Sequence, residues 1–169
     1  MKRRITKIKH NAGKVKIDYL IERNDEQVDE YSLVCSDAPV PEFAEALQAL
    51  KKVLPAWLEC KPDYCDNMTI LGVSISWKGD NFGCCVTALK PLKSCNSPLV
   101  LNAPHKPMEP YSGDDYANCL TQEQIDGIKN VIAEAEAYID GTRAQMGLFD
   151  GLESVLKEAG VTATITVNA

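Results

Sequence analysis

The sequence predicts an α+β fold: a mostly antiparallel sheet of five or six strands, with two amphipathic helices on one face. The chain opens with three segments of alternating apolar and polar residues separated by short turns, which is typical of an antiparallel meander. Two longer segments, which start near Pro41 and Thr121, repeat apolar residues along one helical stripe. Because each helix offers a single apolar stripe, both are expected to pack on one face of the sheet.

The first three strands are expected at residues 3–9, 15–22 and 31–35. Turn-forming residues separate them at 10–13 and at 24–26. In the second strand apolar residues alternate with polar ones, which predicts one buried face and one exposed face. The expected buried face of that strand consists of Val15, Ile17, Tyr19 and Ile21.

The first helix is expected to begin at Pro41, because proline fits the first helical turn and Glu42 suits the positive end of the helix dipole. Pro55 should kink this helix or end its regular part. Residues 60–64 are expected to form a loop. The apolar stripe of the helix, at steps of four and three, is Phe43, Leu47, Leu50, Leu54 and Trp57.

A hairpin is expected next, with strands at 69–77 and 82–89. Residues 91–120 are rich in proline and are expected to form a long irregular excursion, apart from a short strand at 97–102. Loops of this length are uncommon in compact domains unless they are functional or mobile. Tyrosines beside acidic residues occur in contact surfaces and also as loop anchors. The candidate contact loop in this excursion comprises Tyr111, Asp114, Asp115 and Tyr116.

The second helix is the best marked of all the expected elements. Thr121 and Gln124 form a capping box at its start, and Gly141 can end it in the left-handed conformation. Ile128 and Ile132 are central in its stripe and are therefore expected in the core. The full expected stripe is Ile125, Ile128, Ile132, Ala135 and Ile139.

Length and composition indicate one domain with a tail, since 169 residues with 45% apolar and 25% charged residues are ordinary for a globular chain. Residues 1–141 are expected to form the domain. Residues 142–169 are expected to form a C-terminal tail with a short motif, a brief helix at 151–157 and a strand at 161–167.

Several features point to the cytoplasm. No apolar run approaches the roughly 18–20 residues of a membrane span, so no membrane partner is expected. The basic N-terminus lacks the apolar region of a signal peptide. The seven cysteines are odd in number and irregularly spaced, which favours reduced, mostly buried thiols over a secreted disulfide framework.

Charge is unevenly distributed along the chain. Residues 1–16 hold seven Lys or Arg and no acidic residue, which leaves 11 basic against 24 acidic residues in the remainder, a net charge of −13. We interpret the basic segment as an edge strand whose charges prevent edge-to-edge pairing. The alternative is that it contacts phosphate or an acidic protein. Because phosphate contacts dominate affinity for nucleic acids, a chain of net charge −6 is not expected to bind duplex DNA strongly.

The residues that could carry chemistry form no recognisable catalytic signature. The sequence has no phosphate-binding glycine loop and no Gly-x-Ser-x-Gly elbow. His10 and His105 both fall in expected loops, and neither lies one helical turn from a second metal ligand. We therefore expect a protein that is not an enzyme and that uses no cofactor and no metal. The alternatives are a zinc site completed by distant cysteines, such as Cys60 and Cys65, and a nucleophilic cysteine–histidine pair.

One short motif carries a mechanism: Gln145-Met146-Gly147-Leu148-Phe149. Leu148 and Phe149 are adjacent large apolar side chains that can fill a hydrophobic pocket. The Gln145 amide can both donate and accept hydrogen bonds and thereby fix the register. The five residues resemble the sliding-clamp-binding motif of bacterial replication and repair proteins. Met146 conservatively replaces the usual leucine, whereas Gly147 replaces a serine or aspartate and departs from the pattern.

This resemblance implies that the chain docks on a bacterial DNA sliding clamp. The alternative is that Leu148 and Phe149 pin the tail to the chain's own core, because exposed apolar pairs usually need burial. In size, acidity and layout the whole chain is also similar to small proteins of phages and mobile elements. That similarity implies a non-enzymatic accessory factor of phage DNA metabolism.

A further alternative is an acidic anti-defence protein. Such an inhibitor would occupy a basic surface on a host defence or nucleic-acid enzyme, because charge complementarity steers encounters of this kind.

The purified protein is expected to carry no tightly bound metal, because only Cys60 and Cys65 have a possible pair spacing and the sequence has no histidine-rich cluster. Elemental analysis should find far less than one zinc ion per chain. One zinc ion per chain, retained during dialysis against a chelator, would contradict this expectation.

Overall fold

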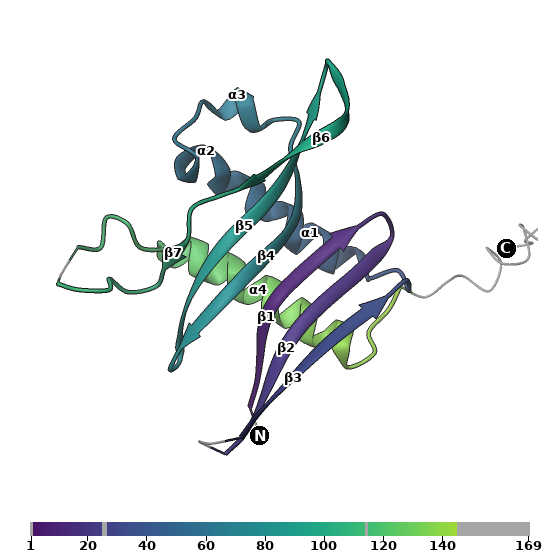
Figure 1. Cartoon of the computed structure of the whole chain (residues 1–169), viewed down its shortest axis with the longest axis vertical. Coiled ribbons are helices and arrows are strands. Elements are labelled where there is room, and N and C mark those ends of the chain that lie inside the picture. Colours follow the sequence, from purple (N-terminus) through teal and green to yellow (C-terminus); the bar gives the residue numbers. More distant parts are fainter. Residues whose placement is uncertain (1, 25–26, 114, 145–169) are drawn as a thin grey trace, which may run out of the picture.

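The structure is a computed structural model, and it describes residues 2–24, 27–113 and 115–144. Helices and strands combine as the sequence predicts, in an α+β fold with a mostly antiparallel sheet (Figure 1). The elements are β1 (Lys2–Asn11), β2 (Lys14–Asn24), β3 (Gln27–Cys35), α1 (Pro41–Ala49), the 3₁₀ helix η1 (Leu50–Val53), α2 (Leu54–Trp57), α3 (Pro62–Cys65), β4 (Thr69–Lys78), β5 (Asn81–Leu92), β6 (Cys95–Asn102), β7 (Lys106–Pro107) and α4 (Gln122–Ile139).

The sheet consists of two antiparallel meanders joined side by side. The strand order is β3-β2-β1-β4-β5-β6, and the short strand β7 pairs with β5 next to the end of β6. Helices α1 and α4 lie against each other and cover one face of the sheet, whereas no helix among the described residues covers the opposite face (Figure 1). We call this opposite face the outer face.

The interpretation of the basic N-terminal segment as an edge strand is wrong, because β1 lies in the middle of the sheet, between β2 and β4. Ile5 and Ile8 are fully buried under the helices. Lys7 and Lys9 therefore point to the outer face, since neighbouring strand residues alternate between faces. His10, which was expected in a turn, lies in β1 with its ring 6.0 Å from the ring of Phe43.

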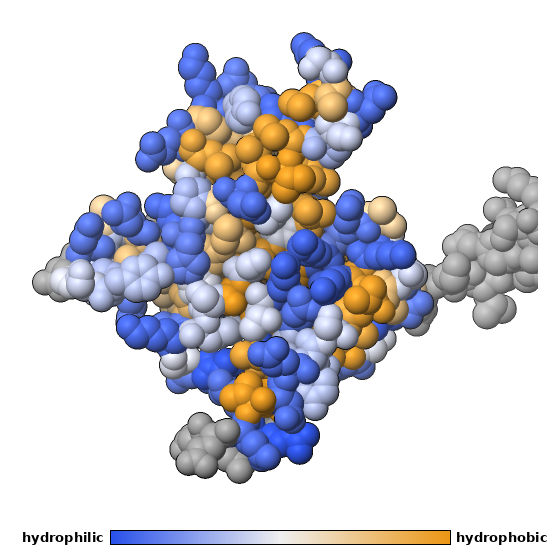
Figure 2. Space-filling view, in the orientation of Figure 1, coloured by the Kyte–Doolittle hydropathy of each residue, from blue (hydrophilic) through white to orange (hydrophobic). Residues whose placement is uncertain are grey.

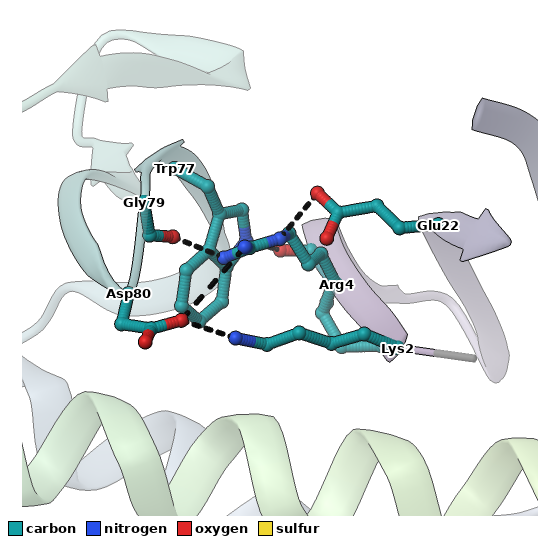
Figure 3. A network of polar contacts seen from close by, with 7 residues as sticks. Lys2, Arg4, Glu22, Trp77, Gly79 and Asp80 are labelled. Carbon is teal, nitrogen blue, oxygen red and sulfur yellow. Dashed lines mark hydrogen bonds and ion pairs between the residues drawn. The ribbon is translucent and has the colours of Figure 1, made fainter. Parts of the chain in front are cut away.

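The two meanders touch over a short stretch and then diverge. Strand β1 pairs with β4 only at three positions, from Lys7 to Lys9. Beyond these pairs, the indole N–H of Trp77 donates to the Ile5 carbonyl at 2.7 Å. Arg4, whose side chain is buried, lies over the Trp77 ring and donates to Glu22 at 2.6 Å and to the carbonyl of Gly79 (Figure 3).

A second cation completes this network. Lys2 forms an ion pair with Asp80, and Arg4 lies 3.9 Å from the same carboxylate (Figure 3). Lys2, and more weakly Arg4, lower the pKa of the Asp80 carboxyl. Side chains therefore close the gap that the diverging strands leave.

The apolar stripe expected for the first helical segment is buried throughout. The segment is not one regular helix, because it tightens into η1 at Leu50–Val53, and Pro55 lies in the first turn of α2. The expected break at Pro55 is thus confirmed. The loop expected at 60–64 is corrected in part, since Pro62–Cys65 forms the one-turn helix α3. The buried stripe is Phe43, Leu47, Leu50, Leu54 and Trp57.

Residues 91–120 are more regular than expected. Strand β5 runs to Leu92, and the strand expected at 97–102 begins earlier, at Cys95. Pro98 is tolerated because β6 is the last strand of the order and need not donate to a further neighbour. The strand expected at 97–102 is therefore confirmed, whereas the expectation of an irregular chain is wrong for residues 91, 92, 95 and 96.

The start and end of α4 agree with the sequence. The N–H of Gln124 donates to the Thr121 hydroxyl at 3.3 Å, and the N–H of Thr121 donates to the Gln124 side chain at 3.1 Å, so the capping box is confirmed. Gly141 has φ +106°, a left-handed conformation that few other residues adopt.

The buried face of α4 is rotated relative to the expected stripe. Val131 and Tyr138 are buried, whereas Ile132 and Ile139 are only partly buried. Tyr138 can be buried because its ring packs on Phe43, with ring centroids 5.6 Å apart, and its hydroxyl donates a hydrogen bond to the Asp37 carbonyl at 2.7 Å. Burial also raises the pKa of the Tyr138 hydroxyl to about 12, which keeps this donor protonated.

The rotation of this face makes two neighbouring isoleucines unequal. Ile128→Ala should lower the free energy of unfolding by about 2–5 kcal/mol, because its side chain is 1% exposed and its removal leaves a cavity. Ile132→Ala should cost about 1 kcal/mol, because its side chain is already in part solvated. Denaturant titration measures both values, and equal losses would show that the α4 packing is misassigned.

Candidate functional site

The candidate site lies on the outer face of the sheet. Cross-strand pairing places the outer-face residues of successive strands in rows. One row runs through Val34, Lys16, Lys9, Gly72, Thr87 and Asn102. The next row runs through Ser32, Asp18, Lys7, Ser74 and Cys85, and Ser76 pairs with Gly83 beyond it.

Over β4 and β5 this face carries small side chains. The outer faces of antiparallel strands are ordinarily covered by longer polar residues. The short side chains of β4 and β5 lie between two taller borders. These borders are the lysines of β1 and β2 on one side and the chain that follows β6 on the other. We call this surface the small-residue floor: Gly72, Ser74, Ser76, Gly83, Cys85 and Thr87.

His105 lies across one end of the small-residue floor. Its ring rests on Gly83, where a Cβ atom would come within 2.3 Å of His105 Cε1. Its Nε2 is 2.8 Å from the hydroxyl of Ser76, and its Nδ1 is 3.1 Å from the hydroxyl of Tyr111. The rings of His105 and Tyr111 are 27° from parallel, with centroids 6.3 Å apart. The result is a chain of hydroxyl, imidazole and hydroxyl.

The backbone on both sides of His105 is fixed to β5. The N–H of Ala103 donates to the Val86 carbonyl at 2.8 Å, and the thiol of Cys85 donates to the Ala103 carbonyl at 2.8 Å. On the other side, β7 pairs with β5, and the N–H of Met108 donates to the Phe82 carbonyl at 2.9 Å. The imidazole is therefore held in place before any ligand binds.

A cavity of about 160 Å³ adjoins His105. Its walls combine apolar and polar groups, as small binding sites generally do. Those groups include Ser76, Trp77, Asn81, Met108, Glu109 and Tyr111.

This geometry suits binding better than nucleophilic catalysis. In a serine triad, a carboxylate holds the second nitrogen of the histidine and stabilises the imidazolium that forms. Here the phenol of Tyr111 holds that nitrogen, and a neutral phenol stabilises a positive charge far less. Ser76 also lies within β4 rather than at an exposed turn, because it and the residues before and after it all pair with β5.

Only some residues of the candidate contact loop lie near His105. Tyr111 is 73% exposed and bonded to His105, and Asp115 borders a second hollow beside the same two rings. Asp115 also accepts a hydrogen bond from the N–H of Ala117 within the loop. Tyr116 is 62% exposed and lines neither hollow. Asp114 lies outside the described residues.

The clamp-like motif lies outside the described residues in full. Gln145, Met146, Leu148 and Phe149 follow directly after Ala144, the last residue that the structure describes.

The sequence did not indicate that Ser76 and Gly83 contact His105. A signal was present in the alternation of the two expected hairpin strands, where most outer positions hold Gly, Ser, Cys or Thr. The sequence suggested His105 only as a metal ligand or as the partner of a nucleophilic cysteine, because Ser76 and Tyr111 lie 29 and 6 residues away from it.

The cysteines give no metal cluster. Cys60 and Cys65 lie with their sulfur atoms 3.4 Å apart, and burial, followed by Cys60 itself, raises the pKa of the Cys65 thiol to about 11. Within residues 2–24, 27–113 and 115–144, no group of three or more His, Cys, Asp or Glu side chains is arranged to hold a metal ion. Of the helices in the same ranges, none has the length and apolarity that a bilayer crossing requires.

Comparison of the chain with protein-family models, with curated proteins and with solved structures finds no match. Its function therefore has to be argued from its own residues.

The contact between His105 and Gly83 can be tested by adding one methyl group. Gly83→Ala should push the imidazole off the floor and cost about 1–3 kcal/mol, because the added Cβ overlaps the ring. The Cε1–H resonance of His105 should move in NMR spectra, which is simple to follow in a chain with two histidines.

Gly127→Ala is the matched control. The nearest atom to its added Cβ is a Leu50 methyl at 3.8 Å, so this variant should raise stability by up to about 1 kcal/mol and leave the His105 resonance in place. An unmoved His105 resonance in Gly83→Ala would show that the ring does not rest on Gly83.

Proposed function

We propose that the chain is a non-enzymatic accessory protein of phage or mobile-element DNA metabolism, which docks on a bacterial DNA sliding clamp through residues 145–149. The observation that carries this proposal is the motif Gln145-Met146-Gly147-Leu148-Phe149 and its position. It begins one residue after Ala144, whose N–H donates to the Ala38 carbonyl at 3.0 Å.

The chain just before the motif is held against the domain. After α4, the N–H of Thr142 donates to the Ala137 carbonyl at 2.9 Å. The guanidinium of Arg143 lies 3.5 Å from the centre of the Tyr138 ring. A motif that follows such an anchor directly can dock a partner close to the domain, and the entropy cost is limited to ordering a few residues.

The packing around Ala144 also favours the binding of Leu148 and Phe149 to a clamp over their burial in the chain's own core. Ala135 and Tyr138, the buried residues of the last turns of α4, are 0% and 1% exposed. Phe43 of α1, which packs on Tyr138, is likewise 1% exposed. Phe43 and Arg143 both lie against the Tyr138 ring, so residues of the domain contribute to this burial, which favours docking by Leu148 and Phe149 over pinning.

The contacts of His105 on the outer face support the proposal that the protein is not an enzyme. Its hydroxyl–imidazole–hydroxyl chain has a phenol where nucleophilic catalysis needs a carboxylate. A sliding clamp acts on chromosomal or phage DNA, so the proposal places the protein in the bacterial cytoplasm.

The second candidate is an acidic inhibitor of a host defence or nucleic-acid enzyme. The helix layer favours it, because Glu42 and Glu45 of α1 face Glu134 of α4 across a shallow groove. The exposed residues of α4 include Glu123 and Asp126 as further acids. A basic enzyme surface would be steered toward such a layer.

Clamp binding can be measured directly. The intact chain should bind an immobilised bacterial sliding clamp at micromolar strength, about −8 kcal/mol. Replacing both Leu148 and Phe149 by alanine should abolish binding, because these side chains are the two apolar anchors. The melting temperature of this variant should remain that of the wild type.

The control replaces a matched apolar pair. Leu99 and Val100 are also adjacent, and their side chains are 40% and 54% exposed on β6. Their double alanine variant should bind the clamp like the wild type. If the Leu148/Phe149 variant unfolds the chain instead, the two side chains belong to its core. In that case, or if the wild type does not bind, the acidic inhibitor becomes the better proposal.

A further inference from the structure

The outer face of β1 and β2 carries a local excess of lysines, which the neighbouring carboxylates neutralise only in part. Lys9 and Lys16 are directly opposite each other in the β1–β2 register. Like charges at such positions destabilise a sheet. Lys7 occupies the next row of the same face, between Ser74 and Asp18. In a chain of net charge −6, an arrangement that costs stability points to a use for the charge.

Of the acidic residues on this side, Glu30 lies on β3 opposite Leu20, and the others are engaged in contacts. Glu22 and Asp80 are bound to Arg4 and Lys2 at the far end of β1 (Figure 3). Asp18 lies 3.6 Å from Lys16 and also accepts a hydrogen bond from Ser32.

Other lysines on this side remain without such partners. Among the described residues, Lys7, Lys9 and Lys14 have no ion-pair partner. Figure 2 shows hydrophilic side chains gathered over β1 and β2 on this face, beside paler residues over β4 and β5. We call Lys7, Lys9 and Lys16 the lysine wall.

The lysine wall borders the small-residue floor directly. A Cβ atom on Gly72 would come 3.0 Å from Cγ of Lys9, so the stem of Lys9 lies over this glycine. The floor spans two strands, which is about 10 Å with its margins. At its other side are the rings of His105 and Tyr111, which are 27° from parallel.

We propose that the outer face binds single-stranded nucleic acid, with its phosphates at the lysine wall and its bases toward His105 and Tyr111. Lysine side chains neutralise phosphates, and exposed rings stack on unpaired bases. An open, nearly flat sheet with low side chains can hold a single strand, as several nucleic-acid-binding sheets do. A duplex offers its grooves to a helix or a two-stranded ribbon, and it hides the faces of its bases.

An acidic peptide is the competing ligand for the same lysines. It would satisfy the charge of the lysine wall, but it would leave the ring of Tyr111 without a role, although this ring is 73% exposed. The acidic helix layer on the opposite side would repel a polyanion and so direct it to the outer face. The inference does not depend on the clamp motif, so either proposal can fail without the other.

The test uses fluorescence anisotropy with a labelled single-stranded oligonucleotide of about 20 residues, titrated with the full chain. The wild type should bind at about 50 mM salt and weaken steeply toward 200 mM, because bound counterions are released. The Lys7, Lys9 and Lys16 triple alanine variant should bind at least about tenfold more weakly, and the slope of log K against log salt should fall by about 2.

A charge-matched control separates the lysine wall from net charge alone. Lys61, Lys93 and Lys129 are exposed and lie in other parts of the fold, and their triple alanine variant should bind like the wild type. Tyr111→Ala should weaken binding about fivefold or more without changing the salt slope, because stacking releases no counterions. Tyr116→Ala, which removes a similarly exposed tyrosine of the same loop, should have no effect.

Circular dichroism should show that each variant is folded. The lysine-wall variant should melt close to the wild type, because the loss of the repulsion between Lys9 and Lys16 offsets the loss of the contact between Lys16 and Asp18.

Four results would overturn the proposal: no binding at low salt, equal loss in the two triple variants, equal affinity for a duplex of the same length, or full displacement of the oligonucleotide by an equal charge of polyglutamate. The last result would assign the face to an acidic peptide.

Discussion

The close approach of two backbones at Gly72 holds the two halves of the sheet together. A Cβ at this position would lie 2.1 Å from the Ile8 carbonyl oxygen, so any other residue would push β4 away from β1. Only three residue pairs join the strands there. Helices α1 and α4 pack across both halves, and a displaced strand would therefore disturb the core and the outer face together. Arg4 and Trp77 support the same junction, because they replace the ladder bonds that are lost where β1 and β4 diverge.

This junction also gives the molecule two faces of opposite charge. A register shift in β1 between Ile5 and Lys7 places both Ile5 and Ile8 under the helices, and Lys7 and Lys9, on either side of Ile8, lie on the outer face. The helices in turn expose acidic residues, among them Glu42, Glu45 and Glu134. A net charge of −6 therefore describes neither face well. A partner would encounter a basic sheet or an acidic helix layer, depending on its own charge.

The two proposals use separate parts of this architecture. The clamp-like motif follows Ala144, which is bound to Ala38, three residues beyond the end of β3 and so at one edge of the sheet. The small-residue floor lies over β4 and β5, with His105 at its end. A chain that holds a single strand on its outer face and a clamp through a short link would bring both to one place. Each half of this arrangement is open to refutation by its own variants.

The sequence by itself determined the fold class, most strand positions, the capping box at Thr121, the helix end at Gly141 and the break near Pro55. These features depend on local periodicity and on the backbone preferences of single residues, which act over a few positions. The position of β1 in the sheet and the rotation of α4 depended on tertiary structure, because an alternating strand looks alike in the centre and at an edge. The sequence could not predict the site at His105, because Ser76, Gly83 and Tyr111 come from three separate segments. Only the pairing of β4, β5 and β7 brings them together.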